Sequence, residues 1–319
     1  MHHLRSPYLT ERHPLVLLPA PMPASFQRRV FLLATATVPM LSACAGGPTP
    51  DRLAEARVAF TRIETAADGR LGVCAFRADG GPVVSHRGQE RFPACSTFKT
   101  LAAAAVLARS DAVPGLLERV VRYGPADMVA YSPVTSRHVG EGMTYAALCA
   151  AALQYSDNTA GNLLLREIGG PAGLTRYVQT LGDPTFRLDR WETALNDAVP
   201  GDLRDTCTPD GMARSLQRLL LGDSLAPAHR ARLVEWMRGN TTGDARLRAG
   251  VPAGWPVADK TGSGDYGTVN DVGVAWPPAG SPLVIAVYFT RGVQPAQDAP
   301  LRHDVVADAT RAVVRALAG

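Results

Sequence analysis

Apolar residues recur at a helical period through the middle of the chain. In five stretches they lie three or four positions apart, so one side of each helix would be apolar. These stretches are residues 98–108, 145–153, 159–167, 209–220 and 227–238. The pattern predicts a largely helical middle.

The two ends of the chain carry shorter apolar or alternating stretches bounded by turn residues, which is typical of strands. Four strands are predicted, at residues 71–77, 82–86, 270–276 and 283–290. Asp79-Gly80-Gly81 predicts a hairpin between the first two strands, and residues 277–280 form a turn between the last two. A helix capped by Asp51 is expected at 51–67, and a final helix at 304–317.

Strands at both ends with helices between them predict an α/β (α+β) fold of two lobes. One lobe, an antiparallel sheet flanked by helices, takes residues 51–93 and 239–319. The other lobe is all-α and takes residues 94–238. A cleft for small molecules is expected where the lobes meet.

The N-terminal segment has the order of an export signal. Arg28-Arg29 precede an apolar run at 30–40, which at about eleven residues is shorter than the roughly 20 that a membrane span needs. The paired arginines are typical of the twin-arginine route, and Leu41-Ser42-Ala43-Cys44 resembles a bacterial lipobox. We therefore predict a signal peptide at 1–44, with Met22 as a second candidate start, and a lipid anchor on Cys44. Residues 45–50 are the predicted linker and 51–319 the catalytic domain.

Composition excludes several functions. Of the formal net charge of +4, residues 1–44 hold four Arg against one Glu, or +3, so about +1 remains and nucleic-acid binding is not expected. The seven His form no H-E-x-x-H motif, so no metal is expected, nor any other cofactor. The five Cys show no tight spacing, and free, buried cysteines are expected beyond Cys44.

Only two of the 33 basic Lys and Arg residues are lysines, and both lie in motifs. A buried lysine can lose its proton and act as a base, whereas arginine cannot. Lys99 follows Ser96 by three residues at a predicted helix start, where amine and hydroxyl share one face. Lys260 opens Lys-Thr-Gly-Ser-Gly, a strand-like segment. A capping serine with a surface lysine, or a strand end with a glycine turn, would explain each segment alone.

These motifs, with Ser156-Asp157-Asn158 between them, resemble the signature of class A serine β-lactamases. The resemblance covers about residues 51–319. It includes Trp191-Glu192-Thr193-Ala194-Leu195-Asn196, similar to the family's Ω-loop motif, and Arg190 with Asp205, similar to the salt bridge of that loop.

The resemblance implies a two-step acyl transfer that opens a β-lactam antibiotic. Ser96 would attack the lactam carbonyl, and the backbone N–H groups of Ser96 and Ser263 would stabilise the oxyanion. Either Lys99 or Glu192, acting through water, would take the serine proton. Ser156 would pass a proton to the lactam nitrogen.

The resemblance also assigns residues to substrate binding and to release of the product. Asn158 would bind the side-chain amide and Tyr131 would line the cleft. The substrate carboxylate would be bound by Lys260, Thr261 and Ser263. Glu192 and Asn196 would hold the water that frees Ser96.

The chain departs from the family at three positions. Val269 stands where many relatives carry a carboxylate-binding arginine, and Arg246 matches an alternative place for that cation. Cys95 matches a residue that some relatives bridge to the position of Gly264, so that disulfide cannot form here. Cys149 matches one half of a second family bridge, whose other position holds Ala103 here.

Two other functions fit part of the pattern. A penicillin-binding D-alanyl-D-alanine peptidase shares the serine, lysine and Lys-Thr-Gly motifs but gives no role to Glu192 or Asn196. A non-catalytic lipoprotein that senses β-lactams would be acylated without turnover. We expect a hydrolase that acts as a monomer, and the choice among penicillins, cephalosporins and carbapenems stays open.

Overall fold

The fold is described for residues 49–291 and 296–318 in a computed structural model. The predicted leader, with Cys44, lies outside the described residues. Residues 45–319 form one of the two compact units of the chain.

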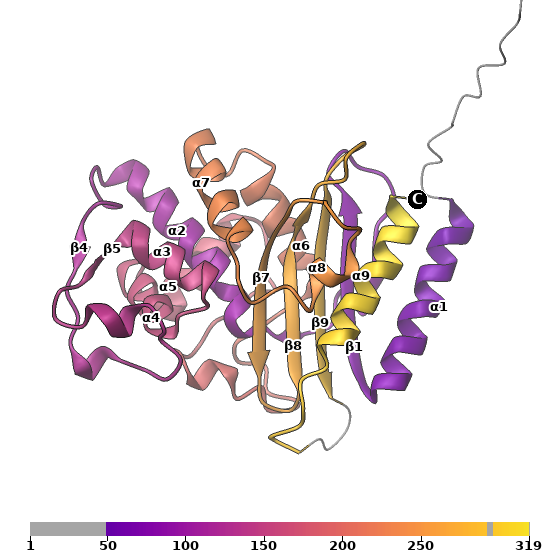
Figure 1. Cartoon of the computed structure of the whole chain (residues 1–319), viewed down its shortest axis with the longest axis horizontal. Coiled ribbons are helices and arrows are strands. Elements are labelled where there is room, and N and C mark those ends of the chain that lie inside the picture. The colour runs from indigo at the N-terminus through magenta and orange to yellow at the C-terminus, as the bar shows by residue number, and fades with distance from the viewer. Residues whose placement is uncertain (1–48, 292–295, 319) are drawn as a thin grey trace, which may run out of the picture. The chain divides into compact units, whose positions relative to one another are not determined.

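Five antiparallel strands form the central sheet in the order β2-β1-β9-β8-β7 (Figure 1). The strands are β1 (Gly69–Arg77), β2 (Val84–His86), β7 (Val257–Gly264), β8 (Thr268–Ala275) and β9 (Leu283–Arg291). In the β1–β9 pair, Gly69 lies opposite Arg291 and Arg77 opposite Leu283. The four predicted strands are therefore confirmed, and the two ends of the chain share one sheet.

Both faces of the sheet are covered by helices. Helices α1 (Pro50–Ala67) and α9 (His303–Leu317) pack side by side on one face, together with the short α8 (Leu247–Gly250) (Figure 1). Helix α6 (Pro209–Leu220) packs on the other face. Successive residues of a strand point to opposite faces, and β1 accordingly shares its buried side chains between the two cores.

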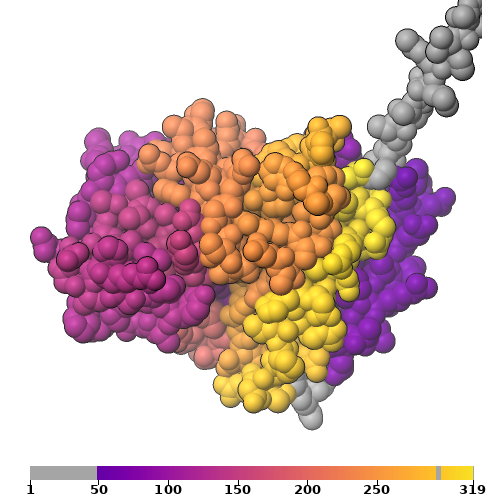
Figure 2. Space-filling model, viewed as in Figure 1, coloured from indigo at the N-terminus to yellow at the C-terminus, as the bar shows by residue number. Residues whose placement is uncertain are grey.

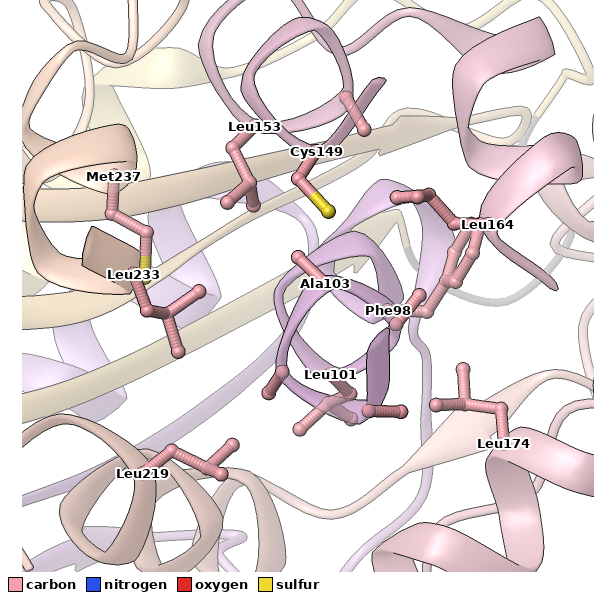
Figure 3. Packing of buried hydrophobic residues seen from close by; sticks show 14 of the residues in the cluster. Phe98, Leu101, Ala103, Cys149, Leu153, Leu164, Leu174, Leu219, Leu233 and Met237 are labelled. Carbon is pink, nitrogen blue, oxygen red and sulfur yellow. The ribbon is translucent and has the colours of Figure 1, made fainter. Parts of the chain in front are cut away.

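The remaining long helices form a cluster around α2 (Phe98–Ala112). They are α3 (Tyr145–Gln154), α4 (Asn158–Glu167), α5 (Gly170–Thr180) and α7 (Pro227–Arg238). All ten residues from Phe98 to Leu107 are buried, so this part of α2 is enclosed on every side. Figure 3 shows Leu101 and Ala103 on α2 among side chains from the surrounding helices.

Short elements connect these parts. The strand pairs are β3 (Phe92–Pro93) with β6 (Thr206–Cys207), and β4 (Val120–Val121) with β5 (Met143–Thr144). The 3₁₀ turns are η1 (Cys95–Thr97), η2 (Pro125–Asp127), η3 (Thr135–His138) and η4 (Ala194–Asn196). Turn η1 leads directly into α2 and so fixes the position of Ser96.

The predicted helices α1, α4 and α9 each begin one residue earlier than expected. Helix α1 begins at Pro50, and Thr49 rather than Asp51 is its cap, with Oγ1 accepting from the Arg52 N–H at 3.4 Å. Proline suits the first turn because the N–H it lacks would have no helical partner. Helix α5 was not predicted because its first turn holds Gly170, Pro171 and Gly173, a composition typical of loops.

Among the described residues, no helix combines the length and apolarity that crossing a membrane requires. Across the same part of the chain, no three His, Cys, Asp or Glu side chains gather as metal ligands would. In the space-filling view, the magenta helical part and the orange residues of the C-terminal third meet along a seam across one face (Figure 2).

Candidate active site

Ser96, Lys99 and Glu192 meet at the start of α2. Lys99 Nζ lies 2.9 Å from Ser96 Oγ and 2.9 Å from Glu192 Oε1. Ser96 Oγ lies 3.3 Å from the same Glu192 oxygen, so the three groups form a closed triangle. The side chains of Lys99 and Glu192 are both fully buried. The structure thus brings together residues that are 96 positions apart in the sequence.

The ammonium of Lys99 has further partners on α4 and on the turn before it. It donates to Asn158 Oδ1 over 2.6 Å and to the Ser156 carbonyl over 2.8 Å. Burial lowers the pKa of Lys99, and the carboxylate of Glu192 opposes that shift. An amine in such surroundings is closer to the neutral form that a base requires.

Lys260, on the edge strand β7, approaches the same turn from the opposite side. Its Nζ donates to Ser156 Oγ over 3.0 Å and to the Thr261 carbonyl over 2.7 Å. Ser156 Oγ also lies 3.4 Å from Lys99 Nζ, so one hydroxyl contacts both lysines of the chain. The pKa of Lys260 is lowered well below its usual value by burial and by repulsion from Lys99 and Arg246.

The turn that carries Ser156 is fixed by Asp157. Its carboxylate caps α4 by accepting from the Ala160 N–H at 2.9 Å, and it also accepts from the backbone and hydroxyl of Thr135. The middle residue of the motif is therefore structural, whereas Ser156 and Asn158 on either side face Lys99.

Residues 190–205, called here the 190–205 loop, hold Glu192 in place. Arg190 Nε donates to Asp205 Oδ2 over 2.5 Å, which forms the expected ion pair. The other oxygen of Asp205 accepts from the N–H groups of Asp189 and Arg190. Asn196 Nδ2 donates to Glu192 Oε2 over 2.5 Å, so the carboxylate is contacted from two sides.

Asn162 is a contact that the sequence analysis missed. Its Oδ1 accepts from the Glu192 N–H at 2.9 Å, and its Nδ2 donates to the Glu192 carbonyl at 3.0 Å. Asn162 lies on α4 one helical turn after Asn158, and residues four apart share a face of a helix. That spacing was the signal available in the sequence.

Arg246 is buried behind β7, with an exposed fraction of 5%. Its guanidinium donates to the carbonyls of Gly262 and Asn270 and to Ser263 Oγ, the last over 2.7 Å. Its Nε donates to Nδ1 of His303, the first residue of α9. The Arg246 guanidinium therefore contacts the Ser263 hydroxyl of β7 directly.

The remaining predicted binding residues lie around these groups. Tyr131 is 62% exposed, and its carbonyl accepts from the Asn158 N–H at 3.0 Å. Thr261 Oγ1 lies 2.5 Å from the hydroxyl of Thr242. Val269, where many relatives carry an arginine, is fully buried.

The four cysteines of the described region are free and buried, as expected. A Cβ built on Gly264 would lie 2.8 Å from Cys95 Sγ, which confirms that these positions are neighbours. Figure 3 shows the sulfur of Cys149 directed toward Ala103. At both places only one of the two bridge positions holds a cysteine.

Comparison with known proteins identifies the family. Residues 55–317 match the model of the β-lactamase enzyme family. The carbapenem-hydrolysing β-lactamase KPC of Klebsiella oxytoca is 48% identical, covering 92% of this chain and 98% of its own. The chain is a class A β-lactamase.

Solved β-lactamases share the fold. The β-lactamase of Burkholderia phymatum is 52% identical with a TM-score of 0.81, covering 84% of this chain and 99% of its own. The β-lactamase of Desulfarculus baarsii is 55% identical with a TM-score of 0.79, over 82% and 96% of the two chains. This class A β-lactamase is accordingly a hydrolase of the β-lactam amide bond that works through an acyl-serine, and neither the peptidase nor the sensor hypothesis is needed.

Proposed function

We propose that Ser96 is the nucleophile of this β-lactamase and that Lys99 and Glu192 move its proton. The observation that carries the proposal is the triangle of Ser96 Oγ, Lys99 Nζ and Glu192 Oε1, with sides of 2.9, 2.9 and 3.3 Å. A general base must lie within hydrogen-bond distance of the proton that it takes, and both groups meet this condition. Substituting Lys99 and Glu192 separately distinguishes the role of each group in proton transfer.

Ser156 transfers a proton to the lactam nitrogen as the ring opens. Its hydroxyl lies between the two lysine amines, 3.0 Å from Lys260 Nζ and 3.4 Å from Lys99 Nζ. Once Lys99 has taken up the Ser96 proton, its positive charge stabilises the alkoxide that forms when the Ser156 hydroxyl gives up its proton. Lys99 then passes its proton to Ser156, which restores the hydroxyl for the next turnover.

The substrate carboxylate is bound by Lys260, Thr261 and Ser263 on β7. Arg246 contributes through the Ser263 hydroxyl, to which it donates over 2.7 Å, and through its positive charge. Backbone N–H groups of Ser96 and Ser263 stabilise the oxyanion.

The acylamido side chain of the substrate lies against Asn158 and Tyr131. The carboxamide of Asn158 uses its oxygen for Lys99 and one N–H for the Ala130 carbonyl, so its second N–H is left for the substrate. The exposed ring of Tyr131 forms the wall opposite.

Glu192 activates the water that hydrolyses the acyl-serine, and Asn196 orients the Glu192 carboxylate. General-base assistance contributes about 10² to 10⁴ in rate. Glu192→Ala is therefore expected to react with a penicillin and accumulate an adduct, visible as a mass increase equal to the whole drug. Ser96→Ala, the matched control, is expected to form no adduct. Turnover by Glu192→Ala at the wild-type rate would contradict the assignment.

We further propose that residues 1–44 are a twin-arginine signal peptide, that Cys44 is lipidated, and that the domain of residues 51–319 acts as a monomer. Class A β-lactamases are typically exported. The order of paired arginines, apolar run and Leu-Ser-Ala-Cys supports the finer assignment. Labelling cells with a radioactive fatty acid tests it, and a mature protein without lipid that starts elsewhere than Cys44 would disprove the anchor.

A further inference from the structure

A cavity of about 1070 Å³ is lined in part by residues 198–203 of the 190–205 loop. Its walls come from the start of β1, the residues before and within β3, the end of β9 and residues 198–203 of the loop. Among the described residues that form these walls, none belongs to the set that we place in the reaction. The cavity is therefore a separate space that shares one wall, the 190–205 loop, with the active site.

Two arginines in this wall have no acidic partner within the described part of the chain. Arg91 donates to the Thr185 carbonyl over 2.6 Å and to Thr206 Oγ1 over 3.0 Å. Arg291 donates to the Ala67 carbonyl over 3.1 Å. All of these acceptors are neutral, so each guanidinium keeps its full positive charge and has further N–H donors to offer.

The other charged groups of the wall are mostly paired. Arg70 pairs with Glu90 over 2.7 Å, and Asp202 pairs with Arg204 over 2.7 Å. Asp68 is the remaining carboxylate and forms no ion pair among the described residues. The formal charges of the wall therefore balance, and what favours an anion is that the two guanidinium groups of Arg91 and Arg291 have no acidic partner among the described residues, against the single carboxylate of Asp68.

Part of the wall is apolar and exposed. Val199 and Leu203 have exposed fractions of 42% and 57%, although most large apolar side chains among the described residues are buried. Pro93 and Pro200 continue the same surface. An apolar wall beside free cations is the usual composition of a small-molecule site, in which apolar contact gives affinity and charge fixes orientation.

We propose that this cavity binds a small amphipathic organic anion. A carboxylate or sulfonate contacts Arg91 and Arg291, and an apolar body covers Val199 and Leu203. Guanidinium groups suit such anions because they can donate two parallel hydrogen bonds to them.

Binding in the cavity is coupled to the position of Glu192. Ala198 of the cavity wall lies two residues after Asn196, whose amide contacts the Glu192 carboxylate. Asp202, also in the wall, lies 4.0 Å from the Arg190 guanidinium that anchors the loop. An occupant that contacts residues 198–203 more tightly in this loop position than in another would hold Glu192 in its place, because a ligand shifts an equilibrium by its different affinity for the two states.

The test uses 8-anilinonaphthalene-1-sulfonate as the probe, because it combines a sulfonate with aromatic rings and fluoresces when bound. The dissociation constant is measured for the wild-type protein and for the variants Leu203→Glu and Arg291→Gln. Matched controls are Leu301→Glu and Arg57→Gln, which change the same residue types at exposed positions outside the cavity. We expect the dissociation constant to rise about tenfold or more in both cavity variants and to stay within about twofold in both controls.

Two further measurements separate this site from the active site and from general adsorption. The probe is titrated again with Ser96 acylated in Glu192→Ala, and displacement by the acyl group would show that the probe occupies the active site and overturn the proposal. The probe should raise the melting temperature of the wild type and of both controls, but not of Leu203→Glu. If Leu203→Glu does not fold, Arg291→Gln decides the matter by itself. Equal affinity in all variants, or an equal loss in the controls, would also overturn the proposal.

Discussion

Nε of Arg246 and Nδ1 of His303 lie 3.0 Å apart, and because a guanidinium can only donate, the imidazole nitrogen must accept. His303 is therefore neutral at Nδ1 whenever this bond exists. Burial and the charge of Arg246 lower the pKa of His303 below its usual 6.5, and Asp304 opposes that shift. His303 also begins α9, where the helix dipole disfavours a cation.

This bond predicts a pH-dependent contribution to substrate binding. Above its lowered pKa the neutral imidazole holds Arg246, and as the pH falls through that pKa, which lies below 6.5, His303 takes up a proton and the bond is lost. The same sign applies to stability, because the unfolded chain binds this proton more readily than the folded one. His303→Ala is expected to raise KM for a penicillin about 2- to 10-fold at pH 7.5, the equivalent of roughly 0.5–1.5 kcal/mol for one hydrogen bond.

The measurement compares kcat/KM from pH 5 to 8 in wild type, His303→Ala and Arg246→Ala. The ratio of wild type to His303→Ala should approach one at acid pH, whereas groups elsewhere in the site titrate equally in both proteins. A ratio that does not change with pH would show that His303 has no part in holding Arg246.

Lys99→Arg should reduce acylation by about 100-fold or more, although the charge is kept. Arginine cannot supply a neutral amine. Space is also short, since a Cβ on Gly161 would already lie 2.9 Å from Lys99 Cε. Stopped-flow acylation with a chromogenic cephalosporin measures the effect. Lys260→Arg should be milder, because that lysine binds and orients. A normal acylation rate in Lys99→Arg would remove Lys99 from proton transfer.

Asn162→Ala should slow deacylation more than acylation. The carboxamide contacts both the N–H and the carbonyl of Glu192, and its loss lets the carboxylate move from its place beside Ser96. We expect a pre-steady-state burst followed by turnover that is about 10- to 100-fold slower, a range within the contribution of general-base assistance. Asn162→Asp keeps the acceptor for the Glu192 N–H. Its turnover rate should therefore lie between those of the wild type and Asn162→Ala. Equal slowing of both steps would instead indicate a general loss of structure.

Asp205 should matter more for stability than its ion-pair partner Arg190. Asp205 is 1% exposed and accepts from two backbone N–H groups besides the Arg190 guanidinium. Removing one partner of a buried pair costs about 3–5 kcal/mol. Asp205→Ala should therefore lower the free energy of unfolding by an amount in this range. Arg190→Ala should lower it less, because the Arg190 side chain is partly exposed. Urea unfolding measures both, and the reverse order would show that the backbone contacts contribute little.

Much of the fold was predictable because its signals are local. Helices α6 and α7 begin and end at the residues predicted from the apolar periodicity and from the proline at each start. The contact of Ser96 with Lys99 depends only on helical spacing. Helix α5 was missed because its glycines resemble a loop until Gly169 and Gly170, with φ of 87° and 73°, are seen to form its start. Asn162, His303 and the cavity under the 190–205 loop depend on segments brought together from distant parts of the chain, which no local pattern records.

The pairing of β1 with β9 has a consequence for biosynthesis. Residues 69–77 leave the ribosome long before residues 283–291, yet neither strand has its main partner until both are present. The edge strand β7 reaches the rest of the sheet only through β8 and β9. A nascent chain without residues 283–291 therefore has no strand to join β7 and β8 to β1, and the complete sheet that carries Lys260 forms only near the end of translation. Such long-range closure also makes folding slow, which extends the time during which a chaperone can hold the unfolded chain.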